Sequence, residues 1–397
     1  MFSRAMAKEL KASARRLPVV TLTGPRQSGK TTLVRQTFPR HAYVSLERPD
    51  ERARAQDDPL GFLSRYRGGV ILDEVQRVPD LLSYIQTSVD ENRGPGRFIL
   101  TGSQNLLLME KVSQSLAGRT AVLRLLPLTI AELTGRRPVD PRRLDRLPRR
   151  LNVPDLDVWS TVWSGFYPRI HDQKLPPERW LADYFRTYVE RDLRDILRVL
   201  DLNTFERFVR LVAARTGQEL KLASLAEDAG ITQPTAQAWL DALKIGFIVT
   251  TLPPHHANYR KRLRKRPRLH FLDTGLACYL LGIHSAHTLE MHPLRGAIFE
   301  SFVVGEIIKG FENAGREAPL FFWRDATGHE LDILLDLGDR LLPVEVKSGL
   351  TVSPDAVNGL RWWTGLPANR NKHGVLIHAG TSAFSLHGFT VLPWFLG

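Results

Sequence analysis

A glycine-rich segment near the N-terminus has the residue types that bind a triphosphate. Residues 24–31 read Gly-Pro-Arg-Gln-Ser-Gly-Lys-Thr, which satisfies the pattern G-x-x-x-x-G-K-[ST]. The two glycines allow a bend in which consecutive backbone N–H groups point at phosphate oxygens. We expect Lys30 at the β- and γ-phosphates and the Thr31 hydroxyl at a Mg²⁺ ion. The candidate nucleotide-binding residues are Gly24, Pro25, Arg26, Gln27, Ser28, Gly29, Lys30, Thr31 and Thr32.

Two adjacent acids follow a second apolar segment. Residues 70–72 read Val-Ile-Leu and lead into Asp73 and Glu74. In parallel α/β sheets, ligands bind at the carboxyl ends of strands. Asp73 is expected to hold Mg²⁺ through water, and Glu74 to orient and polarise the attacking water. A kinase needs no such glutamate, so the pair of acids favours hydrolysis. The alternative for the two acids is a solvated strand end, and the alternative for residues 24–31 is an ordinary glycine-containing turn.

Other polar groups could complete this site. The apolar run 98–101 is followed by Gln104, our first choice for contacting the γ-phosphate or the attacking water, with Ser103 second. Arg119 precedes the next apolar run and could supply positive charge to the transferring phosphoryl group, within one chain or across a subunit boundary. The alternative for Arg119 is an ion pair with a local carboxylate, or solvation.

The elements that must position these residues alternate between strand and helix. This alternation predicts an α/β fold with a parallel sheet. A first amphipathic helix is expected within residues 1–16. Further helices are expected from Lys30 and over 79–91, and strands over 18–23, 42–46, 69–72, 97–101 and 121–126.

Taken together, these residues resemble the AAA-family ATPases. The wider match is to bacterial ATP-binding proteins that join such a module to a C-terminal domain of uncharacterised function. The resemblance implies an ATPase that uses ATP and Mg²⁺ and assembles into rings, with Lys30, Thr31, Asp73 and Glu74 in the phosphate and metal roles. The stretches that carry it are 22–33, 70–79, 98–107, 115–119, 164–168, 188–192 and 271–276.

The middle of the chain turns helical after a Pro- and Arg-rich boundary at 136–150. The sequence here has the outline of a winged helix. Three helix-length units lie at 203–216, 221–229 and 232–244, and an apolar run follows them at 245–252. Thr232 can cap the last helix, and Pro234 fits its first turn. We expect Ala236, Trp239, Leu240 and Leu243 to face the core and Gln233, Thr235, Gln237 and Lys244 to face outward. That outer face carries little positive charge, so a protein contact is favoured over DNA readout by this helix.

A dense basic stretch follows the helical region. Seven of the nine residues in 260–268 are Lys or Arg, and Tyr259 precedes them. Such a stretch can neutralise nucleic-acid phosphates. Its alternative is a solvated loop. The expected contacts are Arg260, Lys261, Arg262, Arg264, Lys265 and Arg266.

Acidic residues recur on two strand-like runs near the C-terminus. Glu345 and Lys347 lie two residues apart in one run and therefore share a face of a strand, and Asp332 can join them from the neighbouring strand. Glu300 lies on the expected helix 296–309. Carboxylates with an ammonium group could hold Mg²⁺, with Asp332 and Glu345 as ligands and Lys347 stabilising charge on a phosphate.

This arrangement resembles the PD-(D/E)xK nucleases. The resemblance implies that Asp332 is the metal acid, that Glu345 and Lys347 form the E-x-K pair, and that Glu300 is the helix acid. Two alternatives stay open: a solvated strand edge and a folded but inactive nuclease domain.

Length and charge limit the organisation of the chain. A single core stops growing at about 250–300 residues, so 397 residues predict several domains. An excess of 55 Lys and Arg over 42 Asp and Glu gives a formal net charge of +13, which favours polyanionic partners. We expect an ATPase core at 1–135, a linker and lid-like segment at 136–200, a winged-helix-like segment at 201–268 and a nuclease-like domain at 269–397.

The remaining expectations concern location and partners. Cys278 is the single cysteine, so it cannot form an internal disulfide, which fits a reducing, cytoplasmic location. No run approaches the roughly 18 apolar residues that span a bilayer. The expected partners are nucleic acid, DNA in the first place, and further copies of the chain, with no membrane. The rival hypothesis is a nucleotide-gated protein-interaction switch whose C-terminal fold is only a docking surface.

Overall fold

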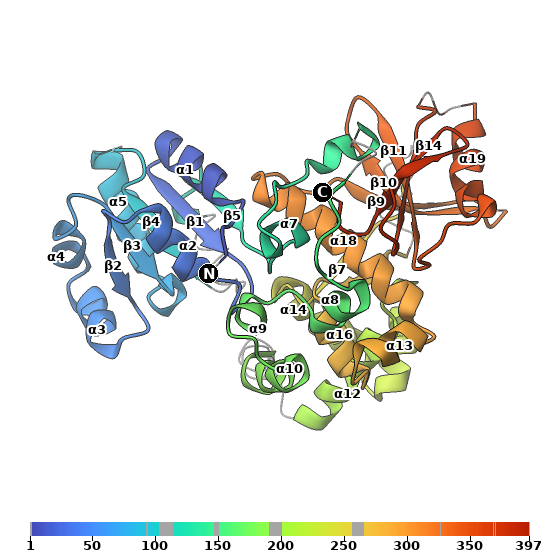
Figure 1. The fold of residues 1–397 in the computed structure, drawn as a ribbon. Helices are drawn as coiled ribbons and strands as arrows, with labels where there is room; N and C mark the ends of the chain where they lie inside the picture. The colour runs from blue at the N-terminus through green and yellow to red at the C-terminus, as the bar shows by residue number, and fades with distance from the viewer. Residues whose placement is uncertain are drawn as a thin grey trace.

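Two large β-sheets and one small one, with helices around and between them, make up the described part of the protein (Figure 1). The structure is a computed structural model. It describes residues 2–92, 94–102, 114–146, 151–189, 201–255, 266–325, 327–367, 369 and 371–396. Of the residues expected at functional sites, Gln104, Ser103, Arg260, Lys261, Arg262, Arg264 and Lys265 lie outside these ranges.

The N-terminal part is a parallel sheet covered by helices on both faces. Its strand order is β2-β3-β4-β1-β5, so the predicted parallel α/β sheet is confirmed. The strands are β1 (Val19–Thr23), β2 (Ala42–Ser45), β3 (Val70–Asp73), β4 (Phe98–Thr101) and β5 (Thr120–Arg124). The helices are α1 (Ala7–Arg16), α2 (Lys30–Thr37), α3 (Pro49–Asp57), α4 (Pro59–Ser64), the short 3₁₀ helix η1 (Val75–Arg77) and α5 (Leu81–Glu91).

Because side chains alternate along each strand, both faces of the first sheet have apolar residues against which helices pack. Val20 and Leu22 pack with α1 and α2 on one face, whereas Val19, Val70 and Leu72 pack on the other. Because all strands are parallel, the carboxyl ends of β1, β3 and β4 lie at one edge of the sheet. That edge carries the residues that follow each buried run.

Helices dominate the middle of the chain. The helices α12, α13 and α14 pack around one apolar core with a small antiparallel sheet of order β6-β8-β7. The elements are α7 (Ile130–Leu133), η2 (Pro141–Arg146), α8 (Val158–Ser164), α9 (Pro168–Asp172), α10 (Pro177–Tyr184), the π-helical turn η3 (Phe185–Val189), α12 (Leu202–Ala214), β6 (Gln218–Glu219), α13 (Leu222–Ala229), α14 (Gln233–Ile245), β7 (Val249–Leu252), β8 (Arg268–Phe271), α16 (Thr274–Leu280) and α17 (Ala286–Met291).

The expected faces of α14 are largely confirmed. Thr232 caps the helix by accepting a hydrogen bond from the Thr235 backbone N–H at 3.3 Å. Gln233 and Gln237 are exposed, but Thr235 and Lys244 are half-buried. The four apolar residues expected in the core are buried: Ala236, Trp239, Leu240 and Leu243.

Two motifs from distant parts of the chain meet inside the molecule and have a structural role. The buried carboxylate of Asp273 accepts hydrogen bonds from the backbone N–H groups of Phe166 at 2.7 Å and Leu276 at 3.0 Å. Gly165 has φ +71°, and a Cβ there would lie 2.4 Å from Asp273 Oδ1. The contact therefore requires glycine, and it joins segment 164–168 to segment 271–276.

The C-terminal part is a mixed sheet between two helices. Its order is β13-β14-β12-β11-β10-β9, with α18 on one face and α19 on the other. The expected helix 296–309 is confirmed within a longer one. The elements are α18 (Arg295–Asn313), β9 (Leu320–Arg324), β10 (Glu330–Asp336), β11 (Leu341–Lys347), η4 (Pro354–Val357), α19 (Asn358–Gly365), β12 (Val375–His378), β13 (Phe384–Leu386) and β14 (Phe389–Pro393).

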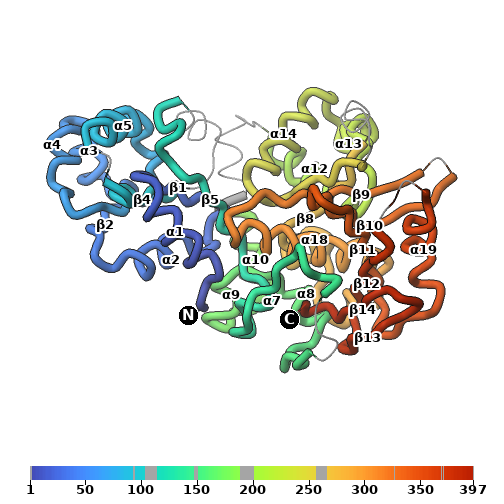
Figure 2. Tube along the Cα trace, turned by 90° about the horizontal axis from the view of Figure 1, so that it is seen from above, coloured from blue at the N-terminus to red at the C-terminus, as the bar shows by residue number. Residues whose placement is uncertain are grey.

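Helix α18 runs through the middle of the molecule, between the two large sheets (Figure 2). Lys309 Nζ donates to the Leu128 carbonyl at 2.7 Å, and Glu306 Oε2 accepts from the Ile130 N–H at 3.0 Å. Both bonds attach α18 to the segment that follows β5. Among the described residues, no helix is both long and apolar enough to cross a membrane.

One ion pair joins the end of α18 to the first sheet and should depend on pH. Arg124 Nη1 on β5 lies 3.4 Å from Glu312 Oε1. Burial raises the pKa of Glu312 to about 7, although Arg124 opposes the shift. The folded chain therefore keeps this proton over a range in which the unfolded chain loses it, so the free energy of unfolding should fall as pH rises from about 4.5 to about 7.

We expect Glu312→Gln to remove this pH-dependent loss. The variant should be more stable than the natural chain by up to about 3 kcal/mol near pH 8, with no difference near pH 4. Urea unfolding at both pH values measures the effect. Glu317→Gln, which changes a neighbouring acid, is the control. A Glu312→Gln chain that is less stable at the higher pH would contradict the prediction.

Candidate nucleotide site and C-terminal acidic cluster

The glycine-rich loop curls between β1 and α2 as its sequence predicts. Lys30 starts α2, is buried, and donates from Nζ to the carbonyls of Gly24 at 3.0 Å and Pro25 at 2.9 Å. Gly29 has φ +92°, and Gly24 has φ +146° with its Cβ position 2.2 Å from the Leu125 carbonyl oxygen. Both glycines are therefore required by the backbone.

Asp73 lies at the carboxyl end of β3 and collects hydroxyl groups from three directions. Thr31 Oγ1 lies 3.0 Å from both carboxylate oxygens, the Tyr43 hydroxyl donates at 2.8 Å, and Thr101 Oγ1 also donates. Burial, and then the bond to Asp73, raise the pKa of Tyr43 to about 12. The structure thus brings Thr31 and Asp73 together, and it adds Tyr43 and Thr101, which follow from no motif.

Glu74 occupies an unusual backbone position. Its φ is +58°, a left-handed conformation that costs a non-glycine residue energy and is common at functional sites. Its carboxylate accepts a hydrogen bond from the Gln76 side chain. The bend turns Glu74 out of the strand, so it faces the cavity beside the loop while Asp73 stays buried beneath it.

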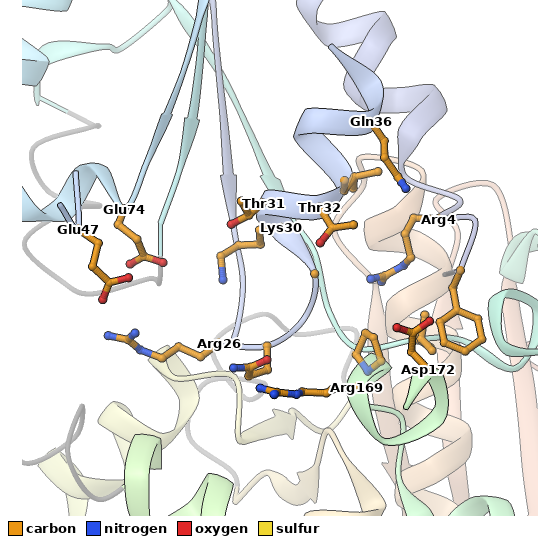
Figure 3. A pocket seen from close by; sticks show the side chains of 16 residues that line it. Arg4, Arg26, Lys30, Thr31, Thr32, Gln36, Glu47, Glu74, Arg169 and Asp172 are labelled. Carbon is orange, nitrogen blue, oxygen red and sulfur yellow. The ribbon is translucent and has the colours of Figure 1, made fainter. Parts of the chain in front are cut away.

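A cavity of about 490 Å³ lies in front of the loop. Lys30, Thr31 and Thr32 reach it from the start of α2, and Glu74 and Glu47 face it from the side (Figure 3). Helix α9 closes another side, so two parts of the chain form the cavity. Its remaining lining residues include Phe2, Arg4, Arg26, Gln27, Gly29, Gln36, Leu128, Pro168, Arg169 and Asp172.

Arg4 supports the loop from the N-terminal segment. Its buried guanidinium donates to the carbonyls of Ser28 and Leu126, both at 2.6 Å, and pairs with Glu132 at 3.1 Å. Glu132 is itself part of a capping box with Thr129 at the start of α7. The only sequence signal for Arg4 was the basic character of residues 1–16, which does not single it out.

Arg119 lies away from this cavity. It precedes β5, at the edge of the sheet opposite to the loop, because Val19 at the start of β1 pairs with Thr120. Its guanidinium makes two contacts with Asp90, at 2.7 and 2.8 Å. The alternative of a local ion pair is therefore confirmed, and a role for Arg119 at the nucleotide of its own chain is wrong; a role across a subunit boundary stays a prediction.

The donors near the loop fit Mg²⁺. A hydroxyl and a carboxylate lie side by side, and Mg²⁺ at such sites takes one or two protein oxygens, with nucleotide phosphates and water filling its other positions. The described residues contain no group of three or more His, Cys, Asp or Glu side chains arranged to hold a metal ion by themselves. A metal here would therefore need the nucleotide as a ligand.

The C-terminal acids also come together. Lys347 Nζ lies 2.9 Å from Glu345 Oε2, and Asp332 Oδ2 accepts the Val346 backbone N–H at 2.8 Å, next to an irregularity in the pairing of β10 with β9. Glu345 is 4% exposed because α19 covers it, so the alternative of a solvated strand edge is wrong for this residue. A cavity of about 580 Å³ opens beside Asp332, Glu345 and Lys347.

An arginine that sequence analysis assigned to the basic stretch points into this cluster. Arg268 Nη2 lies 2.7 Å from Glu330 Oε2, and Nη1 lies 3.4 Å from Glu300 Oε1 and 3.7 Å from Asp332 Oδ1. Arg268 and Glu330 were both missed. A guanidinium thus contacts three carboxylates, and as the side chains stand the cluster does not fit the predicted Mg²⁺ on Asp332 and Glu345.

Burial strongly shifts the ionisation of the cluster. Burial and the Asp332 charge raise the pKa of Glu345 to about 8 and that of Glu300 well above its usual range. Burial opposes protonation of Lys347, but the Glu345 and Asp332 carboxylates outweigh it and raise its pKa. Burial, and then Arg268, lower the pKa of His270 to about 3.

A second surface cavity adjoins the end of the basic stretch. It measures about 470 Å³ and is lined by basic residues including Arg215, Lys221 and Arg324. Arg266 is exposed nearby in the chain, whereas Arg268 is 6% exposed and turned inward. Arg268 therefore lines this cavity while its guanidinium contacts the carboxylates of Glu300 and Glu330.

The parallel sheet and the glycine loop between β1 and α2 have the arrangement of a P-loop nucleotide-binding domain, and a family comparison covers the same part of the chain. Residues 16–134 match the family described as AAA domain. Residues 156–287 and 295–396 match two families described as domains of unknown function, DUF8612 and DUF4143.

Two mycobacterial proteins resemble nearly the whole chain. Uncharacterized protein Rv2008c of Mycobacterium tuberculosis and Uncharacterized protein Mb2031c of Mycobacterium bovis are each 34% identical over 353 residues, covering 88% of this chain and 75% of the relative. The chain belongs to the family of these proteins.

Two solved structures have lower similarity to the chain. The Walker-type ATPase PABY2304 of Pyrococcus abyssi is 16% identical, covers 69% of this chain and 94% of its own, and has a TM-score of 0.39. RuvB of Thermotoga maritima is 19% identical, covers 62% and 87%, and has a TM-score of 0.30.

Proposed function

We propose that the chain hydrolyses ATP with Mg²⁺ and uses the reaction to control nucleic-acid binding by its C-terminal half. The observation that carries the first part is the contact of Thr31 with Asp73 beneath the glycine loop. It places a hydroxyl and a carboxylate where a nucleotide-bound Mg²⁺ needs ligands. Bound Mg²⁺ would neutralise charge on the phosphate oxygens.

Other residues around the cavity would bind the phosphates and activate the attacking water. Lys30 would leave the Gly24 and Pro25 carbonyls and contact the β- and γ-phosphates. Glu74, turned toward the cavity, would orient the attacking water and take its proton. Gln104, which lies outside the described residues, is proposed to contact the γ-phosphate or the attacking water. Arg119 would act on the nucleotide of a neighbouring copy, which requires a homo-oligomer, a ring in the simplest case.

Nucleic-acid binding is supported by charge and by shape. Helices α12 to α14 with the sheet β6-β8-β7 have the composition of a winged helix. The predicted contacts at 260–266 precede Arg268 in the sequence, and Arg268 lines a cavity together with Lys221 and Arg324. At the acidic cavity, Trp362 is 43% exposed and stacks on His329 with ring centroids 3.7 Å apart, a surface on which a base could stack.

A continuous set of contacts could couple the two ends of the chain. Arg4 bonds the loop at Ser28 and pairs with Glu132, and the neighbouring Ile130 is bonded to Glu306 on α18. The same helix carries Glu300 of the acidic cluster. A change in the loop on nucleotide binding would therefore reach the C-terminal part through one rigid helix.

Salt dependence tests nucleic-acid binding. Neutralising Arg262, Arg264 and Lys265 together should weaken DNA binding and reduce the slope of log K against log salt by about 2–3, since each lost phosphate contact removes about 0.9. Fluorescence anisotropy with labelled duplex DNA across a salt series measures both effects.

A matched control keeps the same change in net charge. Neutralising Arg48, Arg54 and Arg65, which lie on the first domain, should leave the slope unchanged if binding is local. An unchanged slope in the first variant would place the nucleic-acid contact elsewhere. Single-stranded DNA and RNA probes in the same series would identify the preferred polymer.

A second candidate function is a nucleotide-gated protein-interaction switch with an inactive nuclease-like domain. The observation that favours it is the Arg268 guanidinium among Glu300, Glu330 and Asp332. Absence of any salt-dependent binding to DNA or RNA by the natural chain would favour this candidate over the first.

A further inference from the structure

We propose that the basic cavity formed by β6, α13 and β9 binds a phosphate group of a single-stranded nucleic acid. The inference rests on the nucleic-acid binding proposed above and gives it a site outside residues 260–266. The cavity measures about 470 Å³. Its lining residues are Arg215, Gly217, Gln218, Glu219, Lys221, Ser224, Arg268 and Arg324.

The lining has more positive than negative charge. Arginine and lysine provide four of its side chains, whereas Glu219 is the one acid among the described residues that line it. Arg324 Nη1 lies 3.1 Å from Glu219 Oε1. Lys221 is exposed and forms no ion pair within the described part of the chain. A phosphate group, with its negative charge and several acceptor oxygens, suits such a lining.

A neutral donor lies among these charges. Arg215 Nη2 lies 3.1 Å from Ser224 Oγ, and Arg215 also pairs with Asp228, which does not line the cavity. Because Ser224 Oγ accepts from Arg215, its own O–H is left to donate. Nucleic-acid phosphates are bound in proteins by arginine, lysine and serine side chains of this kind.

Backbone hydrogen bonds join the two walls of the cavity through the small antiparallel sheet. In one wall, β6 is attached to β8 by a bond from the Gly217 N–H to the Leu269 carbonyl at 2.7 Å. In the other, β9 is attached to the segment after β7 by a bond from the His255 N–H to the Phe322 carbonyl at 2.7 Å. The walls are therefore fixed relative to each other before a ligand arrives, which lowers the entropy cost of binding.

An aromatic surface beside the cavity favours nucleic acid over an acidic peptide. Arg324 pairs across the strands with Glu330, and Glu330 lines the neighbouring cavity together with Trp362. Trp362 stacks on His329 with the ring planes inclined by 6°. Bases of a single strand stack on such rings, whereas aspartate and glutamate have no ring. Duplex bases are already stacked on each other, so the expected ligand is single-stranded.

The salt dependence of binding to an oligothymidylate tests the site. The probe has about 20 nucleotides, more than a typical single-strand site covers, and fluorescence anisotropy follows its binding to the full-length, nucleotide-free chain. Lys221→Met combined with Arg324→Met should reduce the slope of log K against log salt by about 1.4, because each phosphate contact on a single strand contributes about 0.7. For equal binding at 1 M salt, this is roughly 25-fold weaker binding at 0.1 M.

A matched control removes the same charge elsewhere. Lys11→Met combined with Arg65→Met changes two exposed residues of the first domain and should leave the slope unchanged.

Removing the acid of the lining should have the opposite effect. Glu219→Gln releases Arg324 from its ion pair, so binding should become about 2–5-fold tighter, the equivalent of an exposed ion pair. Glu227→Gln, an exposed acid of α13 that does not line the cavity, should bind as the natural chain does. This pair of variants decides the question if the double variant does not fold.

The outcomes separate this site from nucleic-acid binding in general. An unchanged slope in the folded double variant, or unchanged affinity of Glu219→Gln, would overturn the site while binding through 260–266 stands. A natural chain that binds neither oligothymidylate nor duplex DNA nor RNA would refute nucleic-acid binding, and this site with it. If polyglutamate binds more tightly than oligothymidylate and the double variant loses that binding, the cavity belongs to an acidic protein partner and the proposal is wrong.

Discussion

Replacing Glu74 by Gln should leave ATP bound and slow its hydrolysis by about 10²–10⁴-fold, the contribution typical of a positioned general base. The amide keeps the size of the side chain and its contact with Gln76. It cannot accept a proton from water. Because Asp73 and Thr31 lie beneath the loop and are unchanged, the affinity for Mg²⁺ and ATP should stay close to that of the natural chain.

Phosphate release and nucleotide affinity must be measured on the same preparation. Glu47→Gln is a matched control, since Glu47 also lines the cavity but its side chain is 60% exposed and follows no buried strand. It should hydrolyse ATP at close to the natural rate. Normal turnover by Glu74→Gln would show that another group orients the water. Loss of nucleotide binding by the same variant would show that Glu74 has a structural role.

The nucleotide site was predictable because its determinants are local. Strands β1, β3 and β4 of the first sheet are short runs of buried residues. Polar residues with candidate roles come at their ends, as with Asp73 after 70–72. Parallel pairing then places these ends together whatever the details of the loops. The roles of glycines 24 and 29 follow equally from local backbone geometry.

Residues that act at a distance could not be predicted in this way. Arg4 reaches the loop across 24 positions of sequence, and Tyr43 reaches Asp73 from a neighbouring strand. Neither belongs to a motif. Their contacts depend on how α1 and β2 dock against the sheet, which is set by long-range packing.

Arg268 shows a different difficulty. In sequence it ends a run of seven basic residues, so its charge suggests a solvated surface. Its pairing with Leu252 in the small antiparallel sheet turns its side chain inward, toward Glu300 and Glu330. Register decides which face of a strand a residue occupies, and no feature of the basic run indicates that register.

Replacing Lys30 by Met should abolish detectable ATP binding, a loss of at least about 10²-fold in affinity. A buried ammonium on phosphate makes charge-assisted hydrogen bonds, each worth about 1.5–3 kcal/mol. Lys30 is 6% exposed and already makes two bonds to loop carbonyls. Its side chain is therefore directed at the cavity before nucleotide arrives, and no other lysine lines that cavity among the described residues.

Calorimetric titration with ATP and Mg²⁺ measures the loss, and the structure indicates two controls. Lys11→Met removes an exposed lysine of α1 and should bind ATP normally, which excludes an effect of net charge. Lys30→Met leaves the Gly24 and Pro25 carbonyls without their donor, so its thermal unfolding must be compared with that of the natural chain before binding is interpreted. A folded Lys30→Met chain that binds ATP as tightly as the natural one would contradict the assignment of this loop as the triphosphate site, because no conformation of Met supplies the missing charge.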